Sequence, residues 1–186
     1  MRFIYKQNYK VKFFLLCIMS AVLCVMNETL GYAIIPMPTK NISEYHSDIL
    51  TINSIFSGFT LTNLGILLSM TDDQLIKKLE GTDILQKRNV VMGHSIIFGA
   101  ISIFISAIWV LKVNLKFITK FIGIHMFSLI KEFFFYVEIL SLIISIVYFL
   151  MSIAKMIQLL SLIHVPRKRY SEEQVNKLRE QILGKK

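Results

Sequence analysis

The amino-acid sequence predicts an all-α integral membrane protein with four transmembrane helices and short cytoplasmic amphipathic helices. Three observations lead to this fold class. Hydrophobic residues make up 54% of the 186 residues and charged residues only 18%, whereas soluble domains usually carry more charge. The apolar residues gather in four blocks, each near the ~20 residues that cross the hydrocarbon core of a bilayer. The lysines and arginines lie outside these blocks.

The four blocks define one transmembrane domain, residues 13–154, because a segment in lipid must satisfy its backbone hydrogen bonds by forming a helix. The predicted spans are residues 13–35, 52–70, 90–111 and 133–154. Residues 1–12 form a basic cytoplasmic N-terminus. The first block also fits a secretory signal peptide, with a small-residue cleavage site at Gly31, Tyr32 and Ala33. Cleavage there leaves three spans in the same orientation.

Small residues form one face of the second span. Gly58, Thr62, Gly65 and Ser69 recur at helical spacing, and small residues let two helix backbones approach closely in lipid. This face predicts a helix-packing contact within the chain or between subunits, or a strip that faces a pore. Asn63 lies off the face, where its amide is placed to hydrogen-bond a neighbouring helix.

Two carboxylates, Glu28 and Glu138, fall inside predicted spans, in the outer half of the membrane. An ionisable group at this depth is costly and marks a candidate functional site. Glu138 lies near the start of its span, so the structural interpretation is that it reaches the interface or pairs with Lys112. The functional interpretation is a proton or ion role for either carboxylate. His94, near the inner end of the third span, is predicted to be an interfacial side chain.

The segment at residues 112–132 departs from the simple four-span pattern. Lys112, Lys116 and Lys120 form one stripe at a spacing of four, and apolar residues cover much of the remaining surface. An apolar run of this length is typical of an interfacial or re-entrant piece. The segment therefore either lies on the outer leaflet, extends the third span, or dips into the membrane.

The positions of the charges predict the orientation of the chain. Of the 21 lysines and arginines, sixteen lie on the side of the N-terminus and five on the opposite side. Basic residues favour the cytoplasmic side, so both termini of this multi-pass protein of the cell (inner) membrane are predicted to be cytoplasmic. The net charge of +9 is then explained by contact with anionic lipid in the bilayer, and no direct nucleic-acid partner is expected.

Two capped amphipathic helices are predicted on the cytoplasmic side. Residues 71–81 read TDDQLIKKLEG, with Thr71 as the N-cap and Gly81 as the stop. The basic cytoplasmic tail, residues 155–186, contains a second such helix at residues 172–183. Short helices need a surface to hold them, so each either packs on the membrane or docks a cytosolic protein. The candidate contacts with that lipid or partner are Lys77, Lys78, Arg167, Lys168 and Arg169.

Motifs for catalysis, cofactors or metals are absent from the sequence. It contains no HExxH, nucleophile elbow, phosphate loop or paired-cysteine ligand motif. On a regular helix, Cys17 and Cys24 would have α-carbons ~10 Å apart, which is too far for a disulfide. The histidines are scattered along the chain. The protein is therefore predicted not to be an enzyme and to use no cofactor or metal.

A small four-span chain without a large soluble domain predicts a protein that works in an assembly. The leading hypothesis is an oligomeric membrane sensor or effector, a homo-oligomer with a cytosolic protein partner. The alternatives are a channel or transporter subunit and a bacteriocin-immunity-type membrane protein. The span layout and the second span, SIFSGFTLTNLGILLS, resemble the small four-span membrane components of bacterial antiphage defence systems, such as the KwaA subunit of Kiwa. This resemblance implies antiviral defence, a cytoplasmic partner and an oligomer in the membrane.

Overall fold

The computed structural model describes residues 3–30, 35–38, 40–69, 83–112 and 123–164. These residues form four long helices: α1 (Tyr9–Leu30), α2 (Ile42–Ser69), α4 (Ile84–Val110) and α6 (Ile124–His164). The described residues contain no strand. Each helix is long and apolar enough to cross a membrane, which confirms the predicted all-α fold class and a multi-pass membrane protein. The predicted short helices at residues 71–81 and 172–183 lie outside the described residues.

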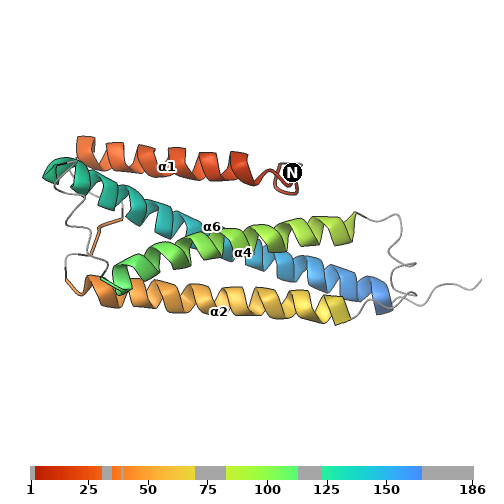
Figure 1. Ribbon diagram of the computed structural model, residues 1–186. Coiled ribbons are helices and arrows are strands. Elements are labelled where there is room, and N and C mark those ends of the chain that lie inside the picture. Colours follow the sequence, from red (N-terminus) through yellow and green to blue (C-terminus); the bar gives the residue numbers. More distant parts are fainter. Residues whose placement is uncertain (1–2, 31–34, 39, 70–82, 113–122, 165–186) are drawn as a thin grey trace, which may run out of the picture.

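The four helices run alternately in opposite directions (Figure 1). Helices α2, α4 and α6 pack together, and α1 lies against α6. The two ends of this bundle are named after a residue near each. The first, the His46 end, carries the start of α2 and of α6 and the end of α4. The second, the Lys12 end, carries the start of α1 and of α4 and the end of α6.

The helices extend beyond the predicted apolar spans. Helix α2 begins at Ile42 rather than at residue 52, and α4 begins at Ile84 rather than at residue 90. Helix α6 has 41 residues, which is about 60 Å at ~1.5 Å per residue and about twice the thickness of the hydrocarbon core. Apolar runs mark only the lipid-covered part of a helix, and polar residues continue each helix past it.

The longer helices include basic residues that flank the predicted apolar spans. Lys12 and Arg88 lie inside helices α1 and α4 and are buried. Lys131 and Lys155 lie inside α6. Lys12 is held there by His94 of α4 and by the carbonyl oxygens of Ile4 and Lys6.

The two ends of the segment at residues 112–132 belong to different elements of the fold. Helix α4 ends at Val110, with Lys112 at a positive φ of 51°, so the segment does not continue the third span. Gly123, at a φ of +84°, supplies the left-handed backbone that glycine adopts readily, and α6 begins at the next residue. Residues 124–132 are therefore the first turns of α6, and residues 113–122 lie outside the described residues.

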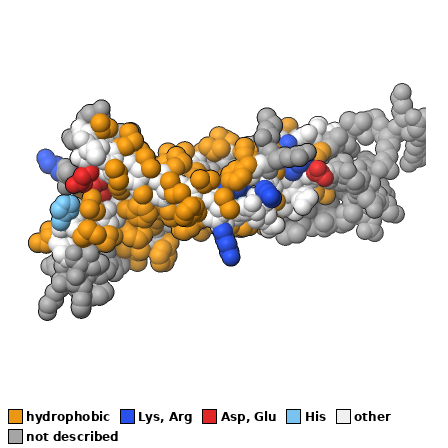
Figure 2. All heavy atoms as spheres, turned by 90° about the horizontal axis from the view of Figure 1, so that it is seen from above, with side chains coloured by type: hydrophobic (Ala, Val, Ile, Leu, Met, Phe, Trp, Pro, Cys, Tyr) orange, Lys and Arg blue, Asp and Glu red, His pale blue; other side chains and the backbone are white. Residues whose placement is uncertain are grey.

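Lipid-facing and buried surfaces are clearly separated. Figure 2 shows a broad band of hydrophobic side chains on one face, with charged side chains to either side of it. Phe14, Phe59, Phe104 and Ile157 are each 59–70% exposed. Large apolar side chains at such positions suit contact with acyl chains rather than water. The polar side chains described next lie on the inside of the bundle.

Candidate functional site: a buried polar core

Polar side chains line the interior where α2, α4 and α6 meet. Each is at most 2% exposed, and they are His46, Asn53 and Thr60 from α2, His94, Ser95, Ser102 and Ser106 from α4, and Glu138, Ser141, Ser145 and Ser152 from α6. In lipid, small and hydroxyl-bearing residues stabilise helix pairs through close packing and hydrogen bonds. The bundle is therefore polar inside and apolar outside over much of its length.

Helix α4 lies close to both α2 and α6 at Gly99. A Cβ atom there would lie 2.9 Å from Ser57 Oγ and 3.0 Å from Ser145 Oγ. Beside it, Ser95 Oγ donates to the Ser145 carbonyl oxygen at 3.0 Å, and Ser145 Oγ donates to the Ser95 carbonyl oxygen at 2.9 Å. This reciprocal pair joins α4 to α6 at the centre of the bundle.

An ionisable pair lies nearer the His46 end. His46 Nδ1 lies 2.9 Å from Glu138 Oε1 and 2.8 Å from Oε2, and both side chains are fully buried. Only the contact with Oε1 has hydrogen-bond geometry, because Oε2 has no hydrogen-bond partner among the described residues. Ser106 Oγ also donates to Oε1. One carboxylate oxygen thus ties α2, α4 and α6 together.

Aromatic rings enclose the imidazole of this pair. Trp109 of α4 stacks on His46, with ring centroids 5.3 Å apart and an interplanar angle of 10°. Tyr45 packs edge-on against the same ring, with centroids 5.5 Å apart. His46 Nε2 is buried and has no hydrogen-bond partner in the part of the chain that is described. The imidazole is held in place, with one nitrogen bonded and the other unpartnered.

A polar hollow lies at the His46 end of the bundle. It has a volume of about 650 Å³, and we call it the mouth; its lining residues are Asn41, Ile42, Ser43, Glu44, Ser47, Val110 and Lys112. Ile42 precedes His46 by four residues, and Val110 follows Ser106 by four. Residues four apart are neighbours along a helix. The mouth therefore lies about one helical turn from the buried pair.

A second buried polar contact, between Lys12 and His94, lies toward the Lys12 end. Lys12 is 7% exposed, and its Nζ lies 2.8 Å from the Ile4 carbonyl oxygen, 3.1 Å from that of Lys6 and 2.9 Å from His94 Nε2. His94 Nδ1 lies 2.6 Å from the Val90 carbonyl oxygen. Because a carbonyl only accepts, Nδ1 carries the proton and Nε2 accepts from Lys12. All three ammonium protons of Lys12 then have acceptors.

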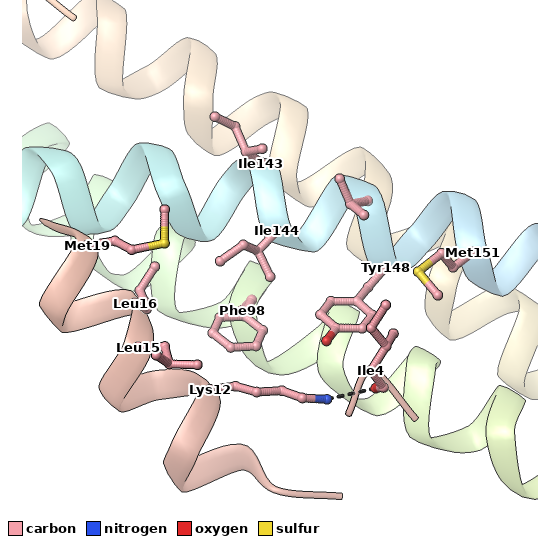
Figure 3. A pocket seen from close by; sticks show the side chains of 11 residues that line it. Ile4, Lys12, Leu15, Leu16, Met19, Phe98, Ile143, Ile144, Tyr148 and Met151 are labelled. Atoms are coloured by element: carbon pink, nitrogen blue, oxygen red, sulfur yellow. Dashed lines mark hydrogen bonds between the residues drawn. The ribbon is translucent and has the colours of Figure 1, made fainter. Parts of the chain in front are cut away.

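An apolar hollow adjoins Lys12 between α1, α4 and α6. It has a volume of about 270 Å³ and lies mainly among leucine, isoleucine and methionine side chains. Figure 3 shows the Lys12 side chain along one edge, reaching toward Ile4, with Phe98 and Tyr148 beside it. Tyr148 stacks on His94 with centroids 5.0 Å apart. Since the Lys12 protons already have acceptors in the protein, Lys12 offers no free hydrogen-bond donor to this hollow.

Comparisons with known proteins do not add to this geometry. No family model, no curated protein and no solved structure matches the chain. The candidate site therefore rests on the described residues alone.

The structure gives Glu138 and His94 surroundings that differ from the sequence-based interpretation. Glu138 does not reach an interface or pair with Lys112; it bonds His46 and Ser106. His94 is fully buried rather than interfacial. The apolar runs placed both residues along their helices correctly, but only the packing of α2 on α4 and α6 brings their partners to them.

Glu28 and Asn63 lie outside the buried pair. The Glu28 side chain is 54% exposed, and its Oε1 lies 4.0 Å from His125 Nε2. Nearby, Asn27 Nδ2 donates to Glu132 Oε1, which links α1 to α6. Asn63 is half-buried on α2. Of the intramembrane polar residues singled out from the sequence, Glu138 alone belongs to the buried polar core.

The small-residue face of α2 points away from the other helices. Gly58, Thr62 and Gly65 are exposed, and a Cβ atom at either glycine would meet nothing within 4 Å. Packing within the chain uses a different face of α2, which carries His46, Asn53 and Thr60. The side chain of Ser69 lies outside the described residues, as do Lys77, Lys78, Arg167, Lys168 and Arg169.

Sequence analysis missed the serines of α4 and α6. Ser95, Gly99, Ser102 and Ser106 recur at intervals of three or four residues within the third block. Ser141 and Ser145 repeat that spacing in the fourth. This was the same small-residue signal that drew attention to α2, and it correctly marks the faces that pack within the chain.

Proposed function

We propose that this protein is an oligomeric membrane sensor or effector that works with a cytosolic protein partner. The observation that carries the proposal is that α2 has two different faces, one packed inside the chain and one exposed. One face packs on α4 and α6 through His46, Asn53 and Thr60. The opposite face, with Gly58 and Gly65, has no contact within the described chain at either glycine.

The exposed face of α2 has the shape of a helix-packing surface. Its small residues lie among large, exposed apolar residues, which are Ile55, Phe59, Leu61 and Ile66. Thr62 Oγ1 donates to the Gly58 carbonyl oxygen at 2.9 Å, so its hydroxyl is satisfied within the helix. A groove of this kind lets a second helix approach closely. A second copy of the chain is the occupant that an oligomer supplies.

The cytosolic partner is supported by the sequence on the predicted cytoplasmic side. Two capped amphipathic segments, residues 71–81 and 172–183, are too short to be stable without a surface. The resemblance to membrane components of antiphage defence systems supports the same arrangement and extends the proposal to bacterial antiviral defence.

Affinity purification of the full chain in mild detergent tests the proposal. We expect an oligomer by light scattering and a cytosolic protein that co-purifies in fixed stoichiometry. The double variant Gly58→Leu/Gly65→Leu fills the α2 groove and is expected to release monomers. Ala100→Leu places a leucine at an exposed position of α4 instead and is expected to leave the oligomer intact. A lone native monomer would overturn the proposal.

A second candidate function is a channel or transporter subunit, favoured by unpartnered polar atoms inside the bundle. Both amide atoms of Asn53 and the hydroxyls of Ser57, Ser102 and Ser141 are buried with no hydrogen-bond partner among the described residues. Polar groups that line a hydrated path are tolerated in membranes. Purified protein in liposomes would then conduct ions, and Asn53→Leu would reduce the flux. No flux from the native oligomer would exclude this function.

A further inference from the structure

The His46–Glu138 pair lies in the bundle with uncharged neighbours. Tyr45 of α2 and Ser106 and Trp109 of α4 contact it. The adjoining core cluster, to which α1, α2 and α6 contribute, consists of Cys24, Ile49, Phe135, Tyr136 and Ile139. Among the described residues, no lysine or arginine forms a salt bridge with Glu138. The pair must therefore balance its own charge.

The contacts of the pair fit an ionised Glu138 beside a His46 that carries a proton on Nδ1. Glu138 Oε1 lies within hydrogen-bond distance of Ser106 Oγ and His46 Nδ1, and the oxygen of an ionised carboxylate accepts from both. His46 Nε2 is the unpartnered nitrogen. With Nε2 unprotonated, the pair carries one negative charge. With a proton on Nε2, the pair becomes an imidazolium–carboxylate ion pair with no net charge.

We propose that the His46–Glu138 pair is a proton-binding site that receives its proton from the mouth at the His46 end of the bundle. An uncompensated charge inside a membrane protein is costly, so proton uptake at His46 Nε2 removes a penalty that the apolar surroundings impose. The proton comes from water, and no other bond is made or broken. The site is independent of the oligomer contact proposed above, because it uses the opposite face of α2.

The mouth provides the route for the proton. Glu44, Ser47 and Lys112 are among the residues that line it, about one turn from His46. Glu44 and Lys112 are exposed and carry opposite charges, so the entrance is polar without a strong net charge. The charge distribution along the sequence predicts that this end faces outward. The site then reads the proton concentration outside the cell.

The protein contains its own reporter of this proton. Trp109 is the single tryptophan of the chain, and its ring stacks on His46. A protonated imidazole in contact with an indole quenches its fluorescence by electron transfer, and a neutral imidazole does so far less. Intrinsic tryptophan emission of the native chain therefore reports the protonation of His46.

The test is a pH titration of tryptophan emission with the full chain in nanodiscs. We expect emission to fall on acidification in a single one-proton step. His46→Gln keeps a donor for Glu138 and is expected to abolish the step. Glu138→Gln removes the carboxylate that pairs with the protonated ring, so its emission at a given acidic pH is expected to exceed that of the native chain. His125→Gln, at an exposed residue of α6, is the matched control and should titrate as the native chain does.

A stopped-flow pH jump tests the route. Ser47→Phe partly fills the mouth and is expected to slow the change in emission at least several-fold, with an unchanged amplitude. Thr51→Phe, one turn farther along α2 and outside the mouth, is expected to respond at the native rate. Equal native rates in both variants would show that protons reach His46 by another path and would overturn the assignment of the mouth.

Two results would overturn the proton site itself. One is native emission that stays constant between pH 8 and the onset of acid unfolding. The other is an emission step that survives in His46→Gln. Neither result depends on the oligomeric state, and a monomeric protein that shows the step would reject the proposed function while supporting this site.

Discussion

At the scale of single residues, Gly99 of α4 has no space for a side chain between α2 and α6. An added Cβ would press on Ser57 Oγ at 2.9 Å and on Ser145 Oγ at 3.0 Å. Ser145 Oγ is already engaged with the Ser95 carbonyl oxygen, so moving it would cost a buried hydrogen bond. Gly65, on the same bundle, has open space around it.

Gly99→Ala is therefore expected to lower the free energy of unfolding by ~1–3 kcal/mol, the usual cost of overpacking a core. Ala100→Met is the control, because it adds bulk at an exposed position of the same helix and keeps a good helix former there. Thermal unfolding of the purified variants in one detergent measures both. Equal losses of stability at the two positions would contradict the packing at Gly99.

The Lys12–His94 contact gives a second prediction at this scale. Lys12→Met leaves His94 Nε2 without its donor, and His94→Phe leaves a Lys12 proton without its acceptor. A buried polar atom without a partner costs ~1–3 kcal/mol. The double variant leaves neither atom unpaired, so it should lose less stability than the two single losses together. Strictly additive losses in thermal unfolding would show that the contact does not couple the residues.

At the scale of elements, α1 is attached differently from the other helices. Its buried residues form a single stripe at a spacing of four: Lys12, Leu16, Ser20 and Cys24. Helix α4, by contrast, has buried residues along most of its length. A helix held by one stripe separates from its neighbours more easily than one surrounded by them. Leu16, at 1% exposed, is the main apolar contact of that stripe.

Leu16→Ala is expected to loosen α1, because a buried leucine cut to alanine costs ~2–5 kcal/mol. The thiol of Cys24, buried on the same stripe, should then react faster with a membrane-permeant maleimide, measured in a Cys17→Ser background. Leu15→Ala is the matched control, since Leu15 is 43% exposed and should leave the rate unchanged. An unchanged rate in Leu16→Ala would indicate that α1 is held by other contacts.

At the scale of the whole molecule, the alternating helix directions place the start of α1 and the end of α6 at the same end of the bundle. The asymmetry of the lysines and arginines predicts that this end is cytoplasmic. In a chain without Cys17 and Cys24, Lys78→Cys should be labelled by an impermeant maleimide only after cells are opened. Lys40→Cys, from the opposite end, should be labelled in intact cells. The reverse pattern would invert the orientation.

Helix number and the class of the protein follow from local properties of the sequence. Four apolar blocks of membrane-spanning length must become helices whatever they pack against, because lipid offers the backbone no hydrogen bonds. The same blocks located Glu138 and the small residues of α2 along their helices. The helix ends could not be predicted from the apolar runs, because three helices begin ahead of them, at Tyr9, Ile42 and Ile84.

Only the tertiary structure decided which distant residues contact each other. His46 and Glu138 lie 92 residues apart, and Lys12 and His94 lie 82 apart, so no local pattern pairs them. The sequence also left open which face of α2 packs inward. Both faces carry residues at helical spacing, Gly58 and Gly65 on one and Asn53 and Thr60 on the other. Which face turns inward depends on the shape and polarity of α4 and α6, and these become neighbours of α2 only when the bundle forms.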